Sequence, residues 1–169
     1  MRVAVIGAGV IGLSTAWALE RRGYACLVFE QGAPGGGQSA GESRIFRHSH
    51  EDPRQVALAV QARRDWNEWE REFGSRLISR DGAMVIGNDG VKRLLRYADD
   101  PALRVRELTS SEVRKALPIL ADYDGVALID ESCGAIRTRL TIANLIGSVG
   151  LNLVPEKVES VKPREGGGG

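Results

Sequence analysis

The sequence predicts an α/β fold that begins with a parallel strand–helix–strand unit. Residues Arg2–Ile6 form a β-branched run that ends at Gly7. The apolar positions from Val10 to Arg22 follow helical spacing and stop at Gly23. Cys26–Glu30 is a second apolar run of strand length. A crossover of this kind is right-handed, and we expect its sheet to be buried on both faces.

A long loop and then a helix are expected after this unit. Gln31–Ser43 is rich in Gly, Ser and Pro and has neither helical nor strand periodicity. Loops of this length inside a compact domain are usually functional. From Gln55 to Gly74 the apolar residues recur at helical spacing, which predicts a helix with Trp66 and Trp69 in its core-facing stripe.

Short strands and helices are predicted for the remainder. Asp81-Gly82 predicts a β-hairpin, and Thr109 with Glu112 forms a capping box at the start of a helix. In chain order, the predicted elements are hairpin strands Leu77–Ser79 and Ala83–Ile86, helices Val91–Ala98 and Ser110–Leu117, strand Gly125–Ile129, turn Asp130–Gly134, helix Leu140–Val149 before Gly150, and strands Leu151–Val154 and Lys157–Val161. The final glycines, Gly166–Gly169, predict no packed element.

Charge and composition exclude several classes of protein. The 23 basic and 22 acidic side chains give a net charge of +1, so neither nucleic acid nor a membrane surface is an expected partner. Cys26 and Cys133 are expected to be buried or idle thiols, and His48 and His50 to be loop residues, without a metal site. Since no apolar stretch suits a signal peptide or a membrane span, we expect a cytoplasmic protein.

Gly7, Gly9 and Gly12 have the spacing of a dinucleotide-binding turn. Gly7 allows the tight turn, Gly9 leaves room for a pyrophosphate, and Gly12 lets the helix pack on the strand. The helix N-terminus then presents free N–H groups to the phosphates. Glu30 ends the second strand, where a carboxylate accepts ribose hydroxyls and repels a 2′-phosphate. This Rossmann-type unit therefore disfavours NADP and suits NAD or FAD.

The loop after Glu30 favours FAD. An NAD-binding half would continue with another helix and strand, whereas this chain continues into Gln38–His48, QSAGESRIFRH. Together with the Gly7–Gly12 unit, this segment resembles the FAD-dependent amine oxidoreductases of the D-amino acid oxidase and monomeric sarcosine oxidase family. The resemblance extends over essentially the whole chain and is closest to the sarcosine oxidase and N-methyltryptophan oxidase branch.

The resemblance implies roles for particular residues. Ser39–Ser43 would lie along the FAD pyrophosphate and flavin, Arg44 close to the flavin ring, and the Val158 backbone against the adenine. Arg47 would bind the substrate carboxylate, for which a guanidinium fork is suited; the alternative for either arginine is a surface salt bridge. The implied cofactor-binding residues are Gly7, Gly9, Val10, Ile11, Gly12, Glu30, Gln31, Ser39, Gly41, Ser43, Arg44 and Val158.

The same resemblance implies an architecture and an activity. Residues 1–50 would begin a Rossmann-type FAD-binding domain, 51–137 would form part of an α+β substrate domain, and 138–169 would return to the first domain. The activity would be oxidation of the C–N bond of an amino acid or N-methyl amino acid by hydride transfer to the flavin, with oxygen as the possible final acceptor. A dehydrogenase of the same fold, or a non-catalytic nucleotide-binding half, are alternatives. Because the family's chains are longer, a fragment or one chain of a two-chain enzyme is expected.

Overall fold

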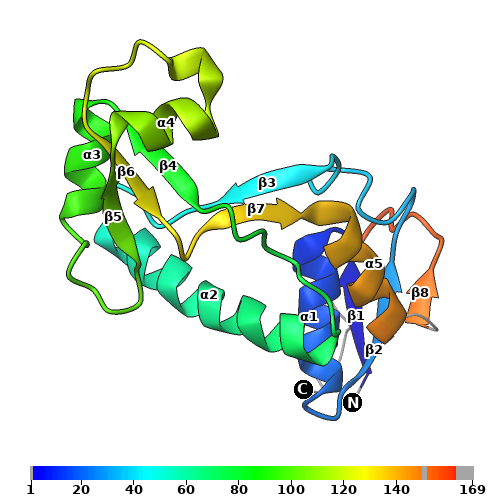
Figure 1. Ribbon diagram of the computed structural model, residues 1–169. Helices are drawn as coiled ribbons and strands as arrows, with labels where there is room; N and C mark the ends of the chain where they lie inside the picture. Colours follow the sequence, from blue (N-terminus) through cyan, green and yellow to red (C-terminus); the bar gives the residue numbers. More distant parts are fainter. Residues whose placement is uncertain (1, 150–151, 163–169) are drawn as a thin grey trace. The chain divides into compact units, whose positions relative to one another are not determined.

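The computed structural model describes residues 2–149 and 152–162, which form parts of two compact units (Figure 1). One unit combines the chain up to Glu42 with the chain from Thr138 onward, and the other is Ser43–Arg137. The sequence placed the first boundary near residue 50, but a strand of the second unit already begins at Ser43. Gly150, Leu151 and the final glycines lie outside the described residues.

The first unit contains the predicted strand–helix–strand crossover. Strand β1 (Arg2–Ile6), helix α1 (Val10–Glu20) and strand β2 (Ala25–Phe29) follow one another, and helix α5 (Thr138–Val149) leads to strand β8 (Leu153–Val154). The sheet order is β1-β2-β8 with every pair parallel, and Val3 is opposite Cys26. The α/β fold class is therefore confirmed.

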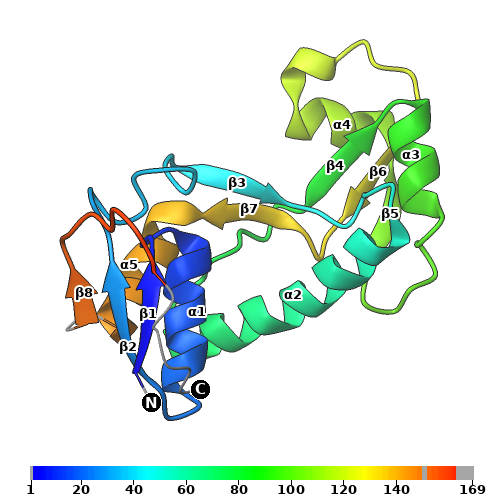
Figure 2. The ribbon, with the colours of Figure 1, turned by 180° about the vertical axis from the view of Figure 1, so that it is seen from behind.

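The sheet of this unit buries one face only, which corrects the expectation of two buried faces. Val5, Cys26 and Val28 are buried, while the alternate residues Ile6 and Leu27 are exposed. Helices α1 and α5 pack against each other on the same side of the strands (Figures 1 and 2). Neither of the two described helices of this unit covers the other side of the sheet, where Ile6 and Leu27 are exposed.

The second unit contains a three-stranded antiparallel sheet and a two-stranded ribbon. The sheet order is β4-β6-β5, and the ribbon pairs β3 with β7 in antiparallel register. Its elements in chain order are β3 (Ser43–Phe46), α2 (Pro53–Glu72), β4 (Ala83–Ile86), α3 (Asn88–Leu95), β5 (Val105–Leu108), α4 (Ser110–Ala116), the 3-10 helix η1 (Pro118–Leu120), β6 (Ala127–Asp130) and β7 (Gly134–Arg137). Strands β3, β5 and β7 are elements that the sequence did not predict.

Local sequence signals predicted the helices of this unit. The capping box is confirmed: the Thr109 hydroxyl accepts from the Glu112 N–H at 3.3 Å, and the Glu112 carboxylate accepts from the Thr109 N–H at 2.9 Å. Trp66 packs against the core formed by Phe46 and its neighbours, and the Trp69 ring contacts the Trp66 ring edge-on at 5.2 Å. No helix within the described ranges is long and apolar enough to cross a membrane.

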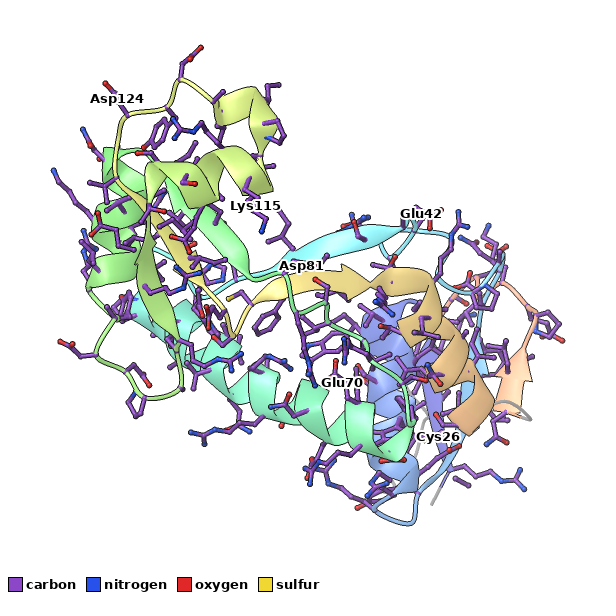
Figure 3. All side chains as sticks on the ribbon, viewed as in Figure 1. Cys26, Glu42, Glu70, Asp81, Lys115 and Asp124 are labelled. Carbon is purple, nitrogen blue, oxygen red and sulfur yellow. The ribbon has the colours of Figure 1, made fainter. Side chains whose placement is uncertain are left out.

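The hairpin predicted at Asp81-Gly82 is wrong. The turn leads into β4, but β4 pairs with β6, and backbone hydrogen bonds of 2.8 and 2.9 Å join Leu77 and Ser79 to β7. Glu70 of α2 fixes the same segment, because its Oε1 accepts from the N–H groups of Leu77 and Ile78 at 2.8 Å each (Figure 3). These partners in α2 and β7 replace the hairpin pairing.

The strand predicted for Lys157–Val161 is also wrong. Residues 155–162 have no regular secondary structure, and β8 is the last strand of the described chain. Glu156, Lys157 and Val158 of this segment instead line a groove described below.

Candidate nucleotide-binding site

The turn after β1 requires glycine at particular positions because of its backbone conformation and its close contacts. Gly7 has φ +96°, a conformation that side chains disfavour. A Cβ on Gly12 would lie 1.8 Å from the Gly7 carbonyl oxygen, so only glycine allows α1 to pack this closely. A Cβ on Gly9 would lie 3.2 Å from Ser39 Oγ, and that hydroxyl accepts from the Val10 N–H at 2.9 Å. The loop and the start of α1 are thus in close contact.

Glu30 is held beside this turn by backbone donors. Its Oε2 accepts from the Ala8 N–H at 2.8 Å and its Oε1 from the Gly32 N–H at 2.9 Å. The Ala8 bond, followed by the Gly32 bond, keeps the pKa of Glu30 below its usual value despite partial burial. The carboxylate is therefore ionised at neutral pH, and each oxygen retains a lone pair for a hydroxyl donor.

The long loop Gln31–Glu42 is irregular, as predicted, but it is anchored at both ends. The Gly35 N–H donates to the Ala8 carbonyl at 2.8 Å, and Gly35 has φ +72°. Near the other end, the Thr138 hydroxyl of α5 donates to the Gly41 carbonyl. These bonds hold the loop against the glycine turn and α5, which gives it a defined course without secondary structure.

A groove of about 920 Å³ lies along the turn, the end of β2, the loop and the segment after β8. This volume is near the upper end of the range of about 300 to 1,000 Å³ that small-molecule sites occupy. The predicted residues that line it are Gly7, Gly9, Val10, Ile11, Gly12, Glu30, Gln31, Ser39 and Val158. Gly41 instead lines a separate hollow of about 340 Å³ between the loop and α5.

Ser43, Arg44 and Arg47 belong to the second unit. Ser43 and Arg44 are on β3, and the Arg44 guanidinium donates to the Ser43 carbonyl at 2.8 Å. Arg47 follows the strand and is exposed. It forms no ion pair or hydrogen bond with any residue that the structure describes, so the salt-bridge alternative has no support for this arginine.

His48 is buried, which the interpretation as a loop histidine did not anticipate. Only 1% of the residue is exposed, and its Nδ1 lies 2.8 Å from Asp130 Oδ2 and 3.2 Å from Cys133 Sγ. Cys133 Sγ lies 3.1 Å from the same Asp130 oxygen, and the Ser132 hydroxyl donates to the other. His48 and Asp130 are 82 positions apart in the chain, so no motif spacing indicated this cluster.

The cluster is organised around the Asp130 carboxylate. Burial opposes its ionisation, but hydrogen bonds from His48, Ser132 and Cys133 outweigh burial and hold the pKa of Asp130 well below its usual range. Burial, followed by the Asp130 charge, raises the pKa of the Cys133 thiol. Cys133 is therefore a protonated donor to Asp130, and it is buried, which is one of the two alternatives predicted for the cysteines.

Comparison with known proteins assigns the family. Residues 2–169 match the family described as FAD dependent oxidoreductase. The chain belongs to this family, and FAD is its cofactor. The resemblance drawn from Gly7–Gly12, Glu30 and the loop is thereby confirmed.

Sarcosine oxidases are among the similar proteins. The chain is 28% identical to the monomeric sarcosine oxidase of Arthrobacter sp. strain TE1826, over 90% of this chain and 43% of that protein. It is 33% identical to that of Streptomyces avermitilis, over 83% of this chain and 38% of the relative. Glycine oxidase from Bacillus cereus ATCC 14579 has a similar fold, with a TM-score of 0.77, 19% identity and coverage of 97% of this chain and 48% of the other. The chain thus spans less than half the length of these proteins.

The residues of the groove fit FAD. Gly9 and Gly12 leave a surface without side chains at the N-terminus of α1, where a Cβ would fill the space or collide. Backbone N–H groups and the helix dipole at this end suit a pyrophosphate, and the ionised Glu30 suits ribose hydroxyls. The contacts of individual residues with FAD stay predictions.

Glu30→Gln is expected to weaken FAD binding about tenfold or more, because hydrogen bonds to a charged group contribute about 1.5 to 3 kcal/mol. The measurement is the FAD dissociation constant, from fluorescence titration of the apoprotein. Glu156→Gln is the matched control, since Glu156 is a carboxylate that lines the same groove and is exposed. Equal affinities for the Glu30→Gln variant and the parent would contradict the role assigned to Glu30.

Proposed function

We propose that this chain supplies the FAD-binding part, and some substrate-binding residues, of an enzyme that oxidises the C–N bond of an amino acid or N-methyl amino acid. The observation that carries the proposal is the groove whose wall combines the glycine turn, the start of α1 and the ionised Glu30. The sarcosine oxidase relatives favour an amino acid or N-methyl amino acid as substrate.

The chain's own residues bind and orient in this proposal. Gly7–Gly12 and the N-terminus of α1 hold the pyrophosphate, and Glu30 holds the ribose. Bound FAD supplies the acceptor for the two electrons and the hydrogen that leave the substrate C–H bond. Arg44 is the cationic residue assigned to the flavin, where a guanidinium stabilises negative charge. Arg47 is assigned to the substrate carboxylate, and because it has no hydrogen-bond or ion-pair partner in the described part of the chain, its guanidinium is available for that anion.

Arg47→Lys is expected to lower kcat/KM for an N-methyl amino acid at least tenfold, at unchanged FAD content. Lysine keeps the charge but loses the planar fork that binds a carboxylate through two parallel hydrogen bonds. Steady-state kinetics of the FAD-loaded enzyme provide the measurement. Arg64→Lys serves as the control, because Arg64 is an exposed arginine of α2 in the same unit. Wild-type kcat/KM in the Arg47→Lys enzyme would count against a carboxylate at this residue.

An assay of electron acceptors separates an oxidase from a dehydrogenase. An oxidase forms hydrogen peroxide in step with substrate loss, whereas a dehydrogenase turns over with an artificial dye and forms no peroxide. The alternative is a dehydrogenase of the same fold. Peroxide formation would identify an oxidase, and dye reduction without peroxide would identify a dehydrogenase.

A further inference from the structure

We infer that His48 is a positioning residue for Arg47, acting through its buried bond to Asp130; this inference rests on the proposed function of Arg47. The chain alternates here, since Phe46 and His48 are buried and Arg47 between them is exposed. Arg47 forms no hydrogen bond or ion pair with a described residue that would fix its direction. The two buried neighbours therefore determine the direction in which its side chain leaves the backbone.

His48 is fixed on several sides. Its Nδ1–H donates to Asp130 Oδ2 at 2.8 Å, and its ring contacts the edge of the Phe46 ring at 5.3 Å and 89°. The His48 carbonyl accepts from the His50 N–H at 2.7 Å, which turns the chain immediately after the buried ring. These contacts of His48 thus fix the backbone immediately after Arg47.

Asp130 connects this residue to the rigid part of the unit. It is the last residue of β6, and it is paired with Ala83 of β4 on one side and Val105 of β5 on the other. Its Oδ1 also accepts from the Ser132 N–H at 3.0 Å. A central strand of a sheet moves little, so the Asp130–His48 bond transfers that rigidity to Arg47.

The backbone on the other side of Arg47 is equally restrained. Phe46 is opposite Gly134 of β7, where a Cβ would lie 2.3 Å from the Ser79 carbonyl oxygen. The Phe46 side chain belongs to the core that includes Ala59 and Ile78. An arginine whose backbone is held on both sides loses less conformational freedom when it binds a carboxylate, and this increases its affinity for the anion.

Within the described chain, only the Nδ1 side of the His48 ring makes a hydrogen bond. The Nε2 atom is buried and has no hydrogen-bond partner among the described residues. The positioning contact therefore needs a donor at the Nδ1 place and nothing at the Nε2 place. Asparagine offers an N–H at about the position of Nδ1, whereas glutamine reaches toward Nε2.

The test measures carboxylate binding to the FAD-loaded enzyme, with propionate as the probe and the change in flavin absorbance as the signal. His48→Gln is expected to raise the propionate dissociation constant about tenfold, and His48→Asn to keep it within about twofold of the parent. Binding of propionamide, which has no charge, is expected to be unaffected by either substitution. A merely structural role would weaken both ligands, or neither, and would show no rescue by asparagine.

The outcomes separate this inference from the proposed function. If Arg47→Met leaves propionate binding intact, the assignment of Arg47 to the carboxylate fails, and the inference fails with it. If Arg47→Met weakens propionate but His48→Gln does not, only the positioning role is overturned. Should His48→Gln not retain FAD, Asp130→Asn replaces it, because this change weakens the same His48–Asp130 bond from its other end. It is expected to raise the propionate dissociation constant at least about threefold, and an unchanged constant would overturn the inference.

Discussion

Gly12→Ala is expected to yield a protein without bound FAD and to lower the free energy of unfolding by about 3 kcal/mol, at the upper end of the usual cost of overpacking. The added methyl would lie 1.8 Å from the Gly7 carbonyl oxygen and 3.3 Å from the Val5 side chain. The first of these neighbours is backbone that continues from β1, which is paired with β2 along its length. Neither can move aside without separating α1 from the strand, which removes the phosphate-binding turn.

Gly147→Ala is the matched control. Gly147 is inside α5, and a Cβ there would meet nothing within 4 Å. This substitution is expected to raise the free energy of unfolding by about 0.5 to 1 kcal/mol through helix propensity, with FAD retained. The ratio of flavin to protein absorbance and a urea titration measure both effects. A Gly12→Ala protein that keeps a full complement of FAD would show that the helix does not need this close approach.

The N-terminal unit was predictable because its signals are local. The spacing of Gly7, Gly9 and Gly12 indicates a turn that has no room for side chains, and Glu30 marks the end of the adjacent strand. The capping box of Thr109 and Glu112 is equally local, and the structure contains both of its bonds. Gly7–Gly12 and Thr109–Glu112 are each one short segment, whereas Glu30 bonds to Ala8 22 positions away and was predicted from its place at the end of the second strand.

The errors arise where distant partners decide. Asp81-Gly82 favours a hairpin, but Glu70 and β7 already satisfy the backbone of the strand that would have formed its first arm. The His48–Asp130 bond joins residues 82 positions apart, and a lone histidine in a polar segment gives no sign of burial. Sequence alternation around Arg47 is the only local hint, and it is too short to distinguish a strand end from a loop.

Asp130→Asn is expected to lower the free energy of unfolding at neutral pH by about 3 kcal/mol, the upper end of the cost of leaving a buried hydrogen-bonding group unsatisfied. Asp130 is only 1% exposed, and its oxygens accept from His48, Ser132 and Cys133. The amide of asparagine presents a donor where these groups also donate, so at least one bond becomes a clash of hydrogens. Asp124→Asn provides the control, because Asp124 is an exposed carboxylate of the same unit (Figure 3).

The pH dependence of this effect has a definite sign. Because the pKa of Asp130 is lower in the folded protein than in the unfolded chain, its contribution to stability is complete above the unfolded pKa of about 4. It decreases as the pH falls below that value toward the folded pKa, since the unfolded chain binds the proton first. The difference in unfolding free energy between the parent and Asp130→Asn should therefore be constant from pH 7 to about 5 and shrink below about 4. Urea titrations across this range measure it, and a difference that stayed constant in acid would mean that Asp130 stabilises the fold by packing rather than by charge.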